Sequence, residues 1–206
     1  MNGAGKNKVL ADMAARTTRA SEWPCGEGFA LLGNVILLTA EDGIEDTVVP
    51  RLLAAGADLN RIEIVSMVVT SGNRDRMFNL GTDLELLRGK IAEVGDVKLV
   101  LVDPISAYLG TGKIDSFRTT DVRAVLGPLV ELANEIGVAF VGIMHFNKKM
   151  DVTNASLPIS DSLAFGAAAR HVYAVVDDTE NKRKLLVRGG HHCIRSLPRP
   201  WRTLRV

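Results

Sequence analysis

Three polar side chains follow three apolar runs that are predicted to be strands. Glu41 lies just past residues 35–38, Asp103 closes a second run, and His145 follows a third. Parallel sheets place their ligands at the carboxyl ends of the strands. We therefore predict one site, in which Asp103 holds Mg²⁺, Glu41 polarises an attacking water and His145 donates to a γ-phosphate.

Each of these residues also has an ordinary structural explanation. Asp103 precedes Pro104 and can cap the next turn, Glu41 can lie in a solvated acidic turn, and backbone groups can satisfy His145. Singly, that explanation is the better one for Glu41 and His145 and equally good for Asp103. Together, at equivalent places along alternating strands and helices, the three favour a site.

The first residues supply half of a phosphate-binding loop. Gly3, Gly5 and Lys6 run directly into a predicted helix over residues 6–20. Glycines let backbone N–H groups surround an oxyanion, a lysine meets the β and γ oxygens, and a helix N-terminus favours negative charge. A flexible glycine-rich terminus that binds nothing is the alternative, and the half-motif alone favours it.

The rest of the chain alternates between strand and helix patterns. Apolar runs rich in β-branched residues predict buried strands at 35–38, 98–103 and 138–144, with further strands at 61–66, 172–176 and 185–187. This order predicts one α/β domain over residues 1–206, with a mostly parallel sheet and helices on both faces.

Apolar residues at helical spacing predict helices at 47–55, 80–94, 120–136 and 160–170. Thr47 is expected to cap the first of these, and Gly127-Pro128 to kink the third. Gly56, Gly95 and Gly137 are expected to follow helix ends.

Charge is distributed unevenly along the chain. Residues 181–206 hold eight basic residues and no acidic ones, whereas the other 180 residues hold 17 basic and 24 acidic residues. A basic tail on an acidic body can meet phosphate, and from charge alone a solvated edge hairpin explains it equally well.

Cysteine content and hydropathy exclude further classes of protein. Cys25 and Cys193 are far apart and lack metal spacing, which argues against a disulfide scaffold and a zinc site. The N-terminus has no apolar signal region, and no apolar run approaches the length of a membrane span. We predict a cytoplasmic protein with no membrane partner.

Several segments together are similar to a known family. They are Gly3-Ala-Gly-Lys6, Val35-Ile-Leu-Leu-Thr-Ala-Glu-Asp42, Thr47-Val-Val-Pro-Arg-Leu52, Leu99-Val-Leu-Val-Asp-Pro-Ile-Ser106, His145-Phe-Asn-Lys148 and Ser162-Leu-Ala-Phe-Gly-Ala-Ala-Ala-Arg170. They resemble the RecA-fold P-loop ATPases, specifically the RepA-like branch of plasmid and phage replication helicases and primase-associated ATPases. The resemblance runs over essentially the whole chain.

The resemblance implies a three-layer RecA-like fold and a homo-oligomeric, hexameric ring. It implies ATP and Mg²⁺ as cofactors and single-stranded DNA as a candidate partner. On the phosphate side it makes Lys6 the Walker A lysine in a loop with Gly3 and Gly5. Asn7 takes the place of the Mg²⁺-ligating hydroxyl residue, and Asp103 becomes the Walker B carboxylate.

On the catalytic side, the resemblance makes Glu41 the water-activating glutamate and His145 the γ-phosphate sensor. Arg170 matches an arginine finger that reaches a neighbouring subunit, although a cation on a helix C-terminal dipole also explains it. Arg51 can lie near the site, where a salt bridge is its better explanation.

Three departures from the family pattern stand out. The sequence starts inside the Walker A loop, so the family's first strand, expected between the strands at 138–144 and 172–176, is missing. Asn7 replaces the usual Ser or Thr, and residues 188–192 differ from the family's run. A truncated chain and a degenerate relative without ATP turnover both explain this, and the position of Met1 favours truncation. A third explanation is that neighbouring secondary structure closes the gap.

The resemblance therefore implies an ATP-binding and ATP-hydrolysing motor domain that acts in DNA replication. Loops at residues 108–115 (with Lys113) and at Lys148 and Lys149, together with the basic tail, are the expected DNA contacts. Aromatic residues make up 5% of the chain and give no stacking platform for bases. The alternative is a non-catalytic assembly module, for which the incomplete Walker A loop is the best evidence.

Overall fold

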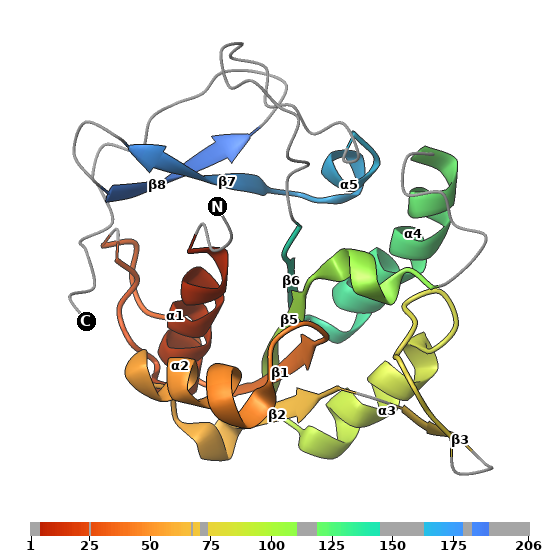
Figure 1. Cartoon of the computed structure of the whole chain (residues 1–206), viewed down its shortest axis with the longest axis horizontal. Helices are drawn as coiled ribbons and strands as arrows, with labels where there is room; N and C mark the ends of the chain where they lie inside the picture. Colours follow the sequence, from red (N-terminus) through yellow and green to blue (C-terminus); the bar gives the residue numbers. More distant parts are fainter. Residues whose placement is uncertain are drawn as a thin grey trace.

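A four-stranded parallel sheet lies at the centre of the computed structural model, which describes residues 5–24, 26–66, 68–70, 74–110, 119–144, 163–178 and 183–189. The strand order is β2-β1-β5-β6 (Figure 1). The strands are β1 (Asn34–Thr39), β2 (Ile62–Val65), β5 (Val97–Asp103) and β6 (Ala139–Gly142). The predicted α/β class with a parallel sheet is confirmed.

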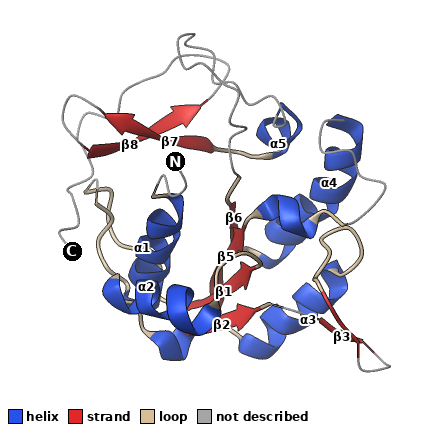
Figure 2. Cartoon of the chain, viewed as in Figure 1, coloured by secondary structure: helices blue, strands red, loops and turns tan. Residues whose placement is uncertain are grey.

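Helices cover both faces of this sheet (Figure 2). Successive side chains of a strand point to opposite faces. On one face, Ile36, Leu38, Val100 and Val102 pack with apolar residues of α3 (Leu84–Val94) and α4 (Thr119–Ile136). On the other, Val35, Leu37, Leu99 and Leu101 pack with α1 (Lys6–Arg19) and α2 (Val49–Ala54). The result is three layers, as the fold class requires.

Most of the predicted helix ends are confirmed. Helix α1 begins at Lys6, and α2, α3 and α4 end just before Gly56, Gly95 and Gly137. These glycines have φ angles of 80°, 64° and 67°, in the left-handed region that glycine adopts without steric cost. Pro128 lies inside α4 and does not end it.

The prediction that Thr47 caps a helix is wrong. A π-helical turn, η1 (Ile44–Val48), precedes α2, and Gly43 is its N-cap residue. The carbonyl of Gly43 accepts hydrogen bonds from the backbone N–H groups of Thr47 and Val48. Thr47 therefore lies inside the helical turn, and Pro50 falls in the first turn of α2.

The predicted start of the next helix at Leu80 is also wrong, because α3 begins at Leu84. The N–H of Leu80 donates to the carbonyl of Tyr108 at 2.7 Å, and the side chain of Leu80 is fully buried. Its helical spacing relative to the residues of α3 therefore reflects burial in the same core rather than a helical backbone.

Strand β6 is shorter and more exposed than predicted. Only Ala139–Gly142 are in the strand, and its first and last residues are exposed. Within the described ranges β6 pairs with β5 alone, which leaves its other side without a strand neighbour to bury it.

The later strands form separate two-stranded sheets. Strand β7 (Val172–Asp178) pairs with β8 (Arg183–Gly189) in antiparallel fashion, so these predicted strands exist but do not extend the parallel sheet. A further hairpin, β3 (Val68–Thr70) with β4 (Arg74–Arg76), was not predicted, because Arg-Asp-Arg shows no apolar alternation.

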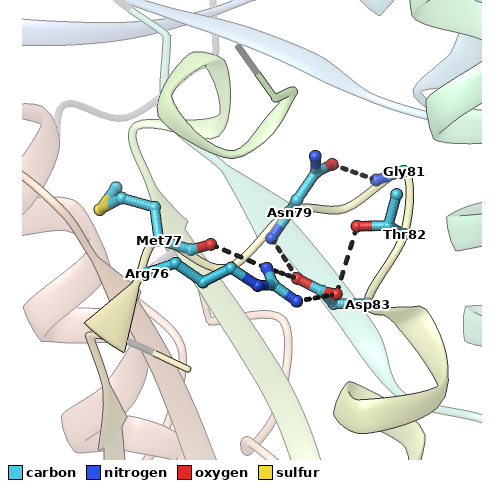
Figure 3. A network of polar contacts seen from close by, with 6 residues as sticks. All are labelled: Arg76, Met77, Asn79, Gly81, Thr82 and Asp83. Carbon is cyan, nitrogen blue, oxygen red and sulfur yellow. Dashed lines mark hydrogen bonds and ion pairs between the residues drawn. The ribbon is translucent and has the colours of Figure 1, made fainter. Parts of the chain in front are cut away.

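A buried carboxylate fixes the segment between β4 and α3 (Figure 3). The side chain of Asp83 is 4% exposed and accepts two hydrogen bonds from the Arg76 guanidinium, at 2.5 and 2.6 Å. It also accepts from the backbone N–H of Asn79 and the hydroxyl of Thr82. These bonds, led by those from Arg76, hold the pKa of Asp83 below its usual value of 3.8.

We predict that Asp83→Ala lowers the free energy of unfolding by about 1–3 kcal/mol, because the Arg76 guanidinium and the Asn79 N–H lose their acceptor. Glu131→Ala, at an exposed position of α4, is the control and should be neutral.

Because the folded pKa of Asp83 is depressed, its ionised form stabilises the protein above pH 3.8, and this contribution is lost as the pH falls further. Denaturant unfolding at about pH 7 and about pH 3 should show the difference between wild type and Arg76→Leu shrinking in acid. A constant difference would contradict this account.

Candidate functional site

The ends of β1 and β5 meet at the carboxyl edge of the sheet. Thr39 is in register with Asp103, and the N–H of Ala40 donates to the carbonyl of Asp103 at 3.1 Å. The acidic pair that follows β1, Glu41 and Asp42, therefore begins beside Asp103. The expected meeting of strand ends is found for these two strands.

The N-terminus of α1 lies at the same edge. Gly5 precedes the helix with a φ of 83°, a conformation that favours glycine, and its carbonyl accepts the N–H groups of Lys8 and Val9. Side chains of α1, among them Leu10 and Ala11, pack in one core with β1 and β5. This packing places a helix N-terminus, with its partial positive charge, near the strand ends.

Lys6, at the start of α1, is hydrogen-bonded to the segment after β6 and is influenced by the charges of two carboxylates. Its Nζ donates a hydrogen bond of 2.8 Å to the carbonyl of Met144, which follows β6. Partial burial lowers the pKa of Lys6, and the negative charges of Asp103 and Glu41 oppose that decrease. The ammonium group is thus partly desolvated and lies within electrostatic reach of both predicted carboxylates.

Asn7 takes part in a second polar group at this edge. Its Nδ2 donates to Oδ2 of Asp42 at 3.1 Å, and Nη1 of Arg51 donates to the same oxygen at 2.7 Å. The salt bridge expected for Arg51 is confirmed. Asp42 was not predicted to act here, although its position beside Glu41, nine residues before Arg51, was the available signal.

A cavity opens beside these residues. Its polar lining comes from Asn7, Thr39, Arg51 and Asp103, and side chains of α1, α2, β1 and β5 form the apolar remainder. Thr39 is 4% exposed and Asp103 7%. Thr39 was not among the predicted site residues, although a hydroxyl at the last position of an apolar strand was the available signal.

The donor set of this cavity fits Mg²⁺. A carboxylate, a hydroxyl and a side-chain amide oxygen are hard oxygen ligands, and Mg²⁺ is held by few such groups while it keeps several waters. Asn7 uses its amide nitrogen toward Asp42, so its amide oxygen can serve as an acceptor or ligand.

The remaining predicted residues either fall outside the described ranges or, in the case of Arg170, lie next to α4. Gly3 and His145 fall outside the described residues, as do Lys113, Lys148 and Lys149. Arg170 follows α5 (Leu163–Ala168), is exposed, and donates to Oδ1 of Asn134 on α4 at 2.5 Å. The structure brings together Lys6, Asn7, Glu41 and Asp103, and it joins Arg170 to α4.

A family model described as an AAA domain matches residues 1–151. This range is well over half of the chain and contains all four strands of the parallel sheet. The chain therefore belongs to the AAA domain family, and it carries a nucleotide-binding domain of the P-loop ATPase type. No curated protein matches the chain. Among the helices of the described ranges, none is long and apolar enough to cross a membrane.

Proposed function

We propose that this chain binds ATP with Mg²⁺ at the edge formed by α1, β1 and β5, and hydrolyses it as a RecA-like, RepA-related motor in DNA replication. The observation that carries this proposal is the convergence of Lys6, Glu41 and Asp103 behind the N-terminus of α1. A cation, two carboxylates and a helix N-terminus in one place are the groups that phosphoryl transfer needs.

Each residue has a distinct task in this proposal. Lys6 leaves the Met144 carbonyl and neutralises the β and γ oxygens. Asp103, with Thr39 and Asn7 beside it, holds Mg²⁺, which when bound neutralises phosphate charge. Glu41 orients a water and accepts its proton as the water oxygen attacks the γ-phosphorus. The bond from that phosphorus to the bridging oxygen breaks, and ADP leaves.

Glu41 is better suited to activate water than its neighbour Asp42. Glu41 is exposed to solvent, and its negative charge acts on Lys6. Asp42 accepts hydrogen bonds from Arg51 and Asn7, so its carboxylate maintains the local geometry. In the proposed ring, the exposed Arg170 serves the site of a neighbouring subunit, where it offsets charge on the transferring phosphoryl group.

Nucleotide binding is the first measurement. A fluorescent ATP analogue should bind in a Mg²⁺-dependent manner, and Lys6→Ala should weaken it by about 100-fold, because a charge-assisted phosphate contact is lost. Lys8→Ala is the matched control, since Lys8 is an exposed lysine on the same helix. Well-folded wild type that does not bind would refute the proposal. Oligomers that form equally with and without ATP would then favour the non-catalytic assembly module.

Turnover tests the role of Glu41. Glu41→Gln should lower kcat by about 10²–10⁴-fold while nucleotide affinity stays near that of wild type, because the amide cannot accept the proton of the water. Glu45→Gln, at an exposed position of η1, should leave both unchanged. Phosphate release in single-turnover experiments separates chemistry from product release. Wild-type turnover by Glu41→Gln would remove this residue from the mechanism.

The proposed DNA role can be tested by measuring how DNA binding depends on salt concentration. Single-stranded DNA should bind with an affinity that falls steeply between about 50 and about 200 mM salt, because lysine contacts release counterions. Replacing Lys148 and Lys149 together by Ala should weaken binding and flatten the salt dependence, whereas Lys8→Ala should not. Binding that is absent at low salt, or insensitive to salt, would argue against a DNA partner.

A further inference from the structure

The carboxylate of Asp42 joins three segments of the chain beside the cavity. Its Oδ2 accepts a hydrogen bond of 3.1 Å from Nδ2 of Asn7, in the first turn of α1. The same oxygen accepts a bond of 2.7 Å from Nη1 of Arg51, in the first turn of α2. One oxygen atom of the turn after β1 is therefore shared by the first turns of two helices.

This contact determines which way the amide group of Asn7 faces. An amide carries its donors on nitrogen and its acceptor on oxygen, so only its nitrogen can bind a carboxylate oxygen. The reversed amide would place its oxygen against Oδ2 of Asp42, with no proton between the two atoms. Arg51 strengthens this preference, because its charge-assisted bond holds the carboxylate in place. Asn7 thus keeps its nitrogen on Asp42.

The amide oxygen of Asn7 is the group that this orientation makes available to a ligand. Asn7 lines the cavity with Thr39 and Asp103, whereas Asp42 is not part of the lining that the described residues form. Asp42 therefore acts on the cavity through Asn7. A Ser or Thr hydroxyl, which the family resemblance places at this position, rotates freely and needs no such partner, whereas an amide must be turned the right way.

On the basis of the function proposed above, we infer that Asp42, held by Arg51, is a positioning residue that presents the amide oxygen of Asn7 to Mg²⁺. The replacement of the usual hydroxyl residue by Asn7 then depends on the acidic residue that follows Glu41. Groups that orient metal ligands matter nearly as much as the ligands, and their loss typically lowers metal affinity by about 10- to 100-fold.

The first test is Asp42→Asn, which keeps the shape of the side chain and removes the carboxylate. The Mg²⁺ concentration that supports half-maximal binding of a fluorescent ATP analogue should rise by about tenfold or more. Asn7→Ala removes the amide but leaves the ion pair of Arg51 with Asp42, and should raise the Mg²⁺ requirement by a similar factor. Asp46→Asn is the matched control, because it removes the same charge at an exposed position of η1 and should leave the requirement unchanged.

A double substitution separates the orientation of Asn7 from a general effect of charge. A serine hydroxyl presents its oxygen to a ligand without help from a carboxylate. In an Asn7→Ser background, Asp42→Asn should therefore change the Mg²⁺ requirement by no more than about twofold, as independent sites do. A loss of charge or of stability would act equally in both backgrounds, so this dependence on residue 7 is specific to a positioning role.

An equal rise in both backgrounds would overturn this inference, since Asp42 would then act through its charge or through the fold. An unchanged Mg²⁺ requirement in Asp42→Asn or in Asn7→Ala, with wild type binding normally, would also overturn it and leave the proposed function standing. Failure of well-folded wild type to bind the analogue with Mg²⁺ would overturn the proposed function, and this inference with it.

Discussion

The parallel pairing of β1 with β5 determines where the candidate functional side chains lie. The two strands are buried on both faces, so a slip of their register would expose apolar residues such as Leu38 and Val102. The same register places Thr39 opposite Asp103 and starts the acidic turn beside it. Helix α1 packs on these two strands, and its N-terminus brings Lys6 to the same edge. The packing of the core thus also assembles the polar site.

Neighbouring acidic residues at this edge have different environments and therefore different chemistry. Asp103 is nearly buried at the end of a strand, Asp42 is fixed by an ion pair with Arg51, and Glu41 is exposed. A buried carboxylate suits a fixed cation, an ion-paired one maintains local geometry, and an exposed one can exchange protons with water. Burial and pairing thus give three acidic residues three different environments, in keeping with the separate roles proposed for them.

Apolar runs in the sequence were sufficient to predict the sheet, the buried strands β1 and β5, and the polar residues at their ends. The prediction failed where tertiary contacts determine local structure. Leu80 has helical spacing, but its N–H donates to the carbonyl of Tyr108. The turn before α2 is capped by Gly43 rather than by Thr47. Strand β6 is exposed because it pairs on one side within the described residues. Thr39 belongs to no motif, since its place beside Asp103 comes from the register of β1 with β5.

Because Lys6 donates a hydrogen bond to the Met144 carbonyl, this carbonyl competes with any ligand for the lysine. An incoming anion gains the ammonium group only by displacing a backbone acceptor, so its net affinity is a difference between two bonds. The exchange also runs in reverse, since any contact that ties up the Met144 carbonyl releases the lysine for a ligand. By thermodynamic reciprocity, the occupancy of the cavity and the state of the chain at the end of β6 influence each other equally. One hydrogen bond thereby links the start of α1 to the chain that follows β6, at the same edge of the sheet as the candidate site.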